Sequence, residues 1–120
     1  MNKDEFFKKL GITGGDWSIS ADEDEYRIEN NAKGFICQHA ETSLKANAHL
    51  ISCAPDMLIA LIKSALTYEK YAEIHTNKRT EEGMKKALKN KEMSVYQATV
   101  IEKATGKTWE EVKELAGRLK

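Results

Sequence analysis

"NAHLISCAPDM", residues 47–57, decides the fold, because one segment of helical period stops there and another begins. Helical spacing of apolar residues starts at Thr42, and one face collects Leu44, Ala48 and Ile51. Pro55 disfavours helical geometry at the residue before it but suits the first turn of a new helix. Asp56 complements the dipole of that new helix. The stretch is therefore predicted to be a corner between two helices.

The segment after the corner, residues 55–76, is predicted to be a helix about 30 Å long at 1.5 Å per residue. Its apolar face is wide and includes Met57, Leu58, Leu61, Ile62, Ala65, Leu66 and Tyr68. Such a face exceeds what one small sheet can cover. The sequence therefore predicts self-association, as a homodimer or a higher homo-oligomer.

Capping signals predict further helices toward the C-terminus. Ser94 with Gln97, and Thr108 with Glu111, both match the capping box, in which a hydroxyl and an acid or amide three residues later cap a helix start. Gly106 between them is suited to end a helix. We expect helix starts at Ser94 and Thr108.

The first 40 residues predict a short helix and then a sheet. Asn2 and Glu5 form a capping pattern, and Gly11 provides a stop for a helix within residues 1–12. Within residues 16–40, apolar and polar residues alternate in three runs separated by turn residues, which is typical of a three-stranded antiparallel β-meander. With long helices across residues 42–120, the predicted class is α+β in a single domain, 1–120.

Charge and composition exclude several classes of protein. The chain has 19 basic and 19 acidic residues, so non-specific attraction to nucleic acid or to a membrane surface should be weak. Two cysteines are too few for a disulfide scaffold. The longest apolar run, 57–62, is far shorter than the ~20 residues of a membrane span, and no signal peptide is evident. We expect a cytoplasmic protein with reduced thiols, and neither a nucleic-acid nor a membrane partner.

Catalytic and metal signatures are weak. Cys37-x-His39 and His49-x3-Cys53 offer four ligand types, but neither pair has the usual zinc-knuckle spacing, so we predict no metal site. The sequence has no nucleophile elbow and no glycine-rich phosphate loop. The expectation is a protein that is not an enzyme, with no catalytic residue and no cofactor.

A nucleotide would therefore have to be held by side chains and helix ends. The candidate ligand-binding residues are Arg27, Phe35, Asn47 and Lys63. Each also has an ordinary interpretation: Phe35 as a core residue, Asn47 as a solvated or capping amide, and the two cations as surface charges. Only a family resemblance favours a ligand-binding role for these four residues.

The stretch "ANAHLISCAPDMLIAL", residues 46–61, resembles the N-A-x-L-I-x-x-A-P-x-(M/L)-L motif of many small phage and prophage proteins. There, as here, the motif follows an acidic sheet, and the segment "ATGKTWEEVKEL" is of the type that ends their C-terminal helices. The outline resembles the phage Thoeris anti-defence sponge proteins. That resemblance implies sequestration, without cleavage, of a cyclic ADP-ribose isomer, glycocyclic ADP-ribose, made by TIR-domain immune enzymes.

The candidate residues suit a sponge in chemical terms. Tight binding without reaction needs an aromatic platform, amides for ribose, cations for pyrophosphate and no general base. The alternative is a small phage adaptor that binds a host or phage protein through the acidic segment, residues 16–29, or the lysine-rich segment, residues 85–91. A nucleic-acid binder using that lysine-rich segment is the least favoured reading, because the net charge is zero.

Overall fold

A computed structural model describes residues 1–14, 16–22, 25–30, 34–39 and 45–119. The α+β class predicted from the sequence is confirmed. Two compact units are present, one formed by residues 1–57 with 118–120 and the other by residues 58–117. Each is described by itself.

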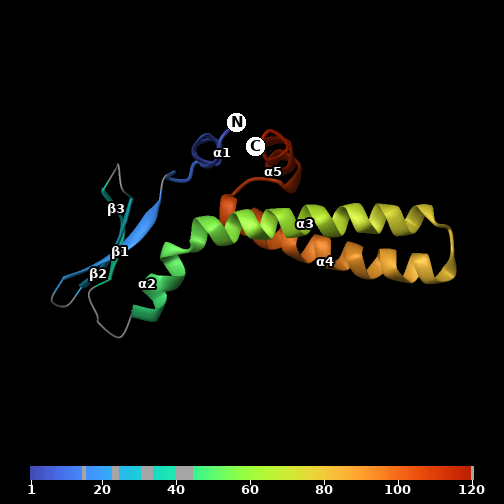
Figure 1. Cartoon of the computed structure of the whole chain (residues 1–120), viewed down its shortest axis with the longest axis horizontal. Helices are drawn as coiled ribbons and strands as arrows, with labels where there is room; N and C mark the ends of the chain where they lie inside the picture. The colour runs from blue at the N-terminus through green and yellow to red at the C-terminus, as the bar shows by residue number, and fades with distance from the viewer. Residues whose placement is uncertain (15, 23–24, 31–33, 40–44, 120) are drawn as a thin grey trace. The chain divides into compact units, whose positions relative to one another are not determined.

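The first unit contains a short helix and an antiparallel sheet (Figure 1). Helix α1 spans Lys3–Lys9, and the strands are β1 (Trp17–Asp22), β2 (Glu25–Asn30) and β3 (Gly34–His39). The strands pair in the order β1-β2-β3. Ile28 is fully buried at the centre, where it pairs with Ile19 and Cys37. Between β2 and β3 the register shifts by one residue next to Ile28, which is a β-bulge.

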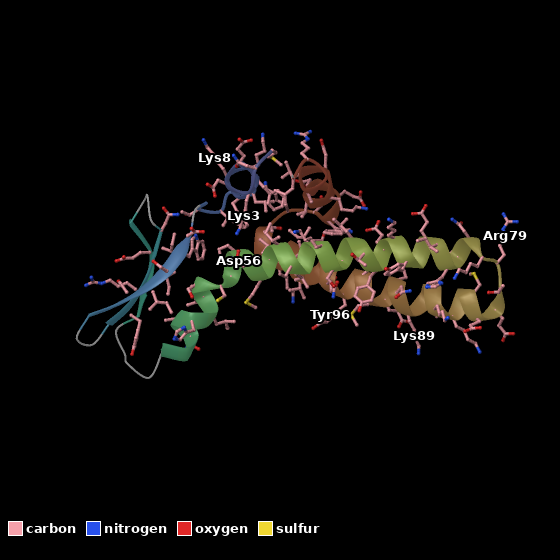
Figure 2. The ribbon with its side chains drawn as sticks, viewed as in Figure 1. Lys3, Lys8, Asp56, Arg79, Lys89 and Tyr96 are labelled. Atoms are coloured by element: carbon pink, nitrogen blue, oxygen red, sulfur yellow. The ribbon has the colours of Figure 1, made fainter. Side chains whose placement is uncertain are left out.

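Helix α1 begins and ends as the sequence predicts. The Oδ1 atom of Asn2 accepts a hydrogen bond from the backbone N–H of Glu5 at 2.9 Å, and Gly11 adopts a left-handed φ of 78° after the last turn. Lys3 then forms an ion pair of 2.6 Å with Asp56, within the first unit (Figure 2). This pair is exposed and contributes less than about 1 kcal/mol.

The predicted corner is confirmed. Helix α2 spans Lys45–Ser52 and helix α3 spans Ala54–Asn77, with a single residue, Cys53, between them. The carbonyl of Cys53 accepts the N–H of Met57 at 2.9 Å, which begins the hydrogen bonding of α3. Pro55 lies in the first turn, where its missing N–H leaves no bond unmade.

The second unit is an antiparallel helix pair with a short third helix (Figure 1). The first helix of the pair is α3, from Leu58 onward, and the second is α4 (Glu81–Thr105). The short third helix, α5, spans Trp109–Ala116. The turn between α3 and α4 holds Arg79 at a left-handed φ of 52°, a conformation unusual for a residue with a side chain. Ile101 of α4 and Val112 of α5 are fully buried.

Of the two helix starts predicted from capping boxes, the one at Ser94 is wrong and the one at Thr108 is confirmed. Ser94 does not begin a helix, because it is a buried residue inside the continuous helix α4, whose N-cap is Thr80. Thr108 does cap α5: its Oγ1 accepts the N–H of Glu111 at 3.2 Å. Gly106 ends α4 at a left-handed φ of 69°, as expected.

Candidate functional site

The helix corner places two neighbouring residues of the motif in opposite environments. Helix α2 packs against β1 and β2, and Ala48 is fully buried. Asn47, one residue earlier, is exposed, and within the described part of the chain its side chain makes no hydrogen bond. The small apolar residue of the motif thus serves the packing, whereas the amide is available to a ligand.

The other three predicted ligand-binding residues are distributed over both units. Arg27 lies half-buried on β2, one of the strands that α2 packs against, and its backbone pairs with Ser20 and Gln38. Phe35 lies on β3 opposite Glu29, but its side chain is outside the described residues. Lys63 is exposed on α3 in the second unit. The structure thus brings Arg27 and Asn47 onto packed elements of one unit.

The residues considered for a metal site are only partly described. His49 and Cys53 are both exposed, and Cys53 is a free thiol. The side chains of Cys37 and His39 lie outside the described residues. Among the side chains that the structure does describe, no group of three His, Cys, Asp or Glu residues is placed to hold a metal ion.

A second candidate site is a groove in the helical unit. It consists of two hollows of about 460 and 230 Å³, which share Glu69 of α3 and Lys91 of α4. We call this the helical groove. Its exposed apolar side chains come from one stripe of α4: Met84, Leu88 and Val95. Small buried side chains also line it: Ala72, Ala87, Ser94 and Ala98.

A polar cluster lies between α3 and α5 at one end of this groove. Lys113 donates to Oε1 of Glu69 at 2.9 Å, and the indole N–H of Trp109 donates to Oε2 of the same carboxylate at 3.1 Å. Lys113 also pairs with Glu110 at 3.1 Å. Both oxygens of Glu69 are therefore occupied, so this carboxylate holds the helices together and is a poor candidate for a general base.

The titration behaviour of the cluster follows from these contacts. Partial burial acts to raise the pKa of Glu69, but hydrogen bonds from Lys113 and Trp109 outweigh it and hold that pKa below the ordinary glutamate value. The hydrogen bond to Glu69 raises the pKa of Lys113 above the ordinary lysine value, against the effect of its own burial. Both groups stay charged near neutral pH, as a structural ion pair requires.

The lysine-rich segment is partly neutralised within its own helix. Lys85 lies 3.8 Å from Glu81, and Lys86 lies 3.2 Å from Glu82, each one helical turn away. Lys91 faces the helical groove. This segment therefore does not form one uniformly basic surface.

The Glu69 cluster was not predicted from the sequence. Trp109 and Lys113 stand four residues apart, which places them on one face of a helix. That spacing was the only local signal, because Glu69 is 44 residues from Lys113 in sequence. No pattern within a helix identifies such a partner.

The sequence of the chain matches a family of phage proteins. A family model described as Salmonella phage P22 protein Y8K6 matches residues 1–108, and the chain belongs to this family. No curated protein and no solved structure matches the chain. Among the described helices, none combines the length and apolar character needed to cross a membrane.

Proposed function

We propose that this phage protein binds and sequesters a cyclic ADP-ribose-type immune signal, such as glycocyclic ADP-ribose, without cleaving it. The proposed pocket lies at the helix corner, with Asn47 as a hydrogen-bonding amide and Arg27 as a cation for pyrophosphate. Phe35 supplies an aromatic face for adenine. Lys63, the fourth residue expected from sequence, belongs to the second unit and is not part of this pocket. Membership of a phage family and the resemblance of the outline of the chain to the sponge proteins support this proposal.

The observation that carries the proposal is the contrast between Asn47 and Ala48. If the motif served packing alone, only its buried positions, Ala48, Pro55 and Leu58, would need a defined side chain. The exposed amide beside it makes no hydrogen bond within the described residues, so it can donate and accept toward ribose or phosphate at no cost to the fold.

Sequestration also requires that the nucleotide survive. Hydrolysis needs a positioned base or an activated nucleophile. Of the groups described near the corner, His49 and Cys53 are exposed, and neither makes a hydrogen bond to an acidic side chain that would orient or activate it. We therefore propose release of the ligand in its original form.

The test uses purified protein and the product of an active TIR-domain enzyme. The mixture is filtered to remove free nucleotide, the retained protein is heated, and the supernatant is analysed by mass spectrometry. We expect the intact cyclic nucleotide in the heated fraction and not in the filtrate. Absence of the nucleotide from that fraction, or recovery of a hydrolysed product, would contradict the proposal.

The alternative function is a phage adaptor for a protein partner. The observation in its favour is the set of exposed apolar side chains along α4, which is unusual for a surface without a partner. The lysine-rich segment is less suited to this role than expected, because Glu81 and Glu82 neutralise two of its lysines. Affinity purification that recovers one stoichiometric protein and no small molecule would favour the adaptor over the sponge.

A further inference from the structure

We propose that copies of this chain associate head to tail, with the outer side of α4 in one copy seated in the helical groove of the next. This proposal concerns residues 58–117 alone and stands without the nucleotide-binding proposal. Self-association expected from sequence was assigned to α3, whereas the structure points to two separate surfaces: the outer side of α4 and the helical groove, which α3 and α4 line together.

The first surface is the outer ridge of α4. It follows the heptad spacing of 4, 3, 4 and 3 residues through Lys89, Met93, Tyr96, Val100 and Lys103. Tyr96 stands two positions from buried Ser94 and from buried Ala98, so it lies on the opposite side of the helix. Its side chain is 67% exposed. Lys89 and Tyr96 can be followed along α4 in Figure 2.

The second surface is the helical groove, whose apolar stripe also has helical spacing. Met84, Leu88 and Val95 are each at least half exposed, and Leu88 reaches 61%. This stripe lies about 90° around α4 from the buried stripe and well separated from the outer ridge, at 100° per residue. One helix thus presents two apolar stripes to solvent, besides the one that packs within the unit.

The charges of the two surfaces are complementary. The outer ridge has a lysine at each end and apolar residues between them, and neither Lys89 nor Lys103 forms an ion pair within the described residues. The groove is net acidic, because four carboxylates line it (Glu69, Glu73, Glu102 and Glu110) against two lysines (Lys91 and Lys113). Lys113 is paired with Glu69 and Glu110, whereas Glu73 and Glu102 lie toward opposite ends of the groove. A ridge with a lysine at each end therefore meets a groove with a carboxylate toward each end and Lys91 between them.

The lengths of the two surfaces also agree. Lys89 to Lys103 spans 14 residues, or about 21 Å, and Met84 to Glu102 spans 18 residues, or about 27 Å, at 1.5 Å per helical residue. The ridge fits within the groove, with helix-in-groove anchors at Met93, Tyr96 and Val100. Because the ridge and the groove are different surfaces, the contact is heterologous and adds copies in a ring or a row.

The test is complementation between two single variants. Leu88→Glu blocks the groove but leaves the ridge intact, and Tyr96→Glu does the reverse. In sedimentation, we expect wild-type protein to gain mass with concentration through the micromolar range, and each variant alone to stay monomeric. An equimolar mixture should form a one-to-one dimer, because one intact ridge meets one intact groove.

Three results would overturn the proposal: a monomeric wild type, a single variant that associates like wild type, or a mixture that stays monomeric. Ile74→Glu is the matched control, since Ile74 is exposed on α3 but does not line the groove. It should associate like wild type. Circular dichroism should show unchanged helix content in all three variants.

A charge variant gives an independent readout that does not require an apolar substitution. Lys89→Glu combined with Lys103→Glu places carboxylates against the acidic ends of the groove. We expect association at least tenfold weaker than that of wild type, and partly restored by added salt, whereas salt should weaken wild-type association. Association of the double variant equal to that of wild type would contradict the proposed seating.

Discussion

The Nζ atom of Lys113 lies 2.9 Å from Oε1 of Glu69, and this contact ties α5 to α3 across 44 residues of sequence. The side chains are 24% and 33% exposed, so water screens the pair only in part. The indole of Trp109 occupies the second oxygen of the same carboxylate. Stability of the helical unit should therefore depend on the charge of this pair.

Replacing Lys113 by Met should lower the free energy of unfolding by about 1 kcal/mol at pH 7, the upper range for a partly exposed ion pair. The measurement is urea unfolding followed by circular dichroism. Lys85→Met is the matched control, because Lys85 pairs with Glu81 at 3.8 Å with both side chains largely exposed. An equal loss of unfolding free energy in both variants would show that the contact between Lys113 and Glu69 stabilises the protein no more than an exposed ion pair does.

The same pair predicts a pH dependence with a defined sign. The pKa of Glu69 is lowered by folding, so its contribution is complete above the ordinary glutamate pKa and is lost as pH falls through the lowered value. The pKa of Lys113 is raised, so its contribution is complete below the ordinary lysine pKa and is lost as pH rises through the raised value. The stability difference between wild type and Lys113→Met should shrink below about pH 4 and above about pH 10.5. A difference independent of pH would contradict this assignment.

Gly83→Ala should destabilise the protein, although alanine normally favours a helix by about 1 kcal/mol over glycine. A Cβ at this position would lie 2.7 Å from Oγ1 of Thr80 and 2.9 Å from the carbonyl oxygen of His75. We expect a loss of about 1 to 3 kcal/mol in the free energy of unfolding. Gly117→Ala is the control, because its Cβ would meet nothing nearer than 3.4 Å. Equal stability of the two variants would mean that Gly83 is not sterically required.

Thr80→Ala and Ser94→Ala test where α4 begins. Thr80 accepts the N–H of Gly83 at 2.9 Å, so its replacement should cost about 1 kcal/mol of unfolding free energy, as for other N-caps. Ser94 is inside the helix, where alanine is the better helix former, so Ser94→Ala should change stability by less than about 0.5 kcal/mol. If Ser94→Ala lowered the melting temperature more than Thr80→Ala does, that result would contradict a helix start at Thr80 and favour the start expected at Ser94.

Local signals predicted much of the helical architecture. Asn2, Pro55 and Thr108 act through hydrogen bonds, or a missing one, within one helical turn, so their effects can be inferred from sequence. Ser94 shares the pattern of Thr108 but lacks a helix break before it, since residues 84–93 contain neither Gly nor Pro. A capping pattern without a preceding break does not start a helix.

The candidate sites could be predicted only in part. Asn47 was identified because a motif surrounds it, and the structure adds that its amide is exposed beside a buried neighbour. The helical groove could not be foreseen, because it depends on which sides of α3 and α4 face each other. That choice is made by tertiary packing between residues far apart in sequence.

The most direct test of the proposed function is retention of the cyclic nucleotide by Asn47→Ala. Loss of the amide from a closed pocket leaves a ligand polar group unpaired, at about 1 to 3 kcal/mol, or roughly ten- to a hundredfold in affinity. The melting temperature without ligand should stay within a few degrees of wild type, because exposed positions change stability by only about 0.5 kcal/mol. Asn77→Ala, the same change at an exposed asparagine at the end of α3, is the control. We expect Asn77→Ala and wild type to retain and release the intact nucleotide and Asn47→Ala to retain none; full retention by Asn47→Ala would contradict the proposed function.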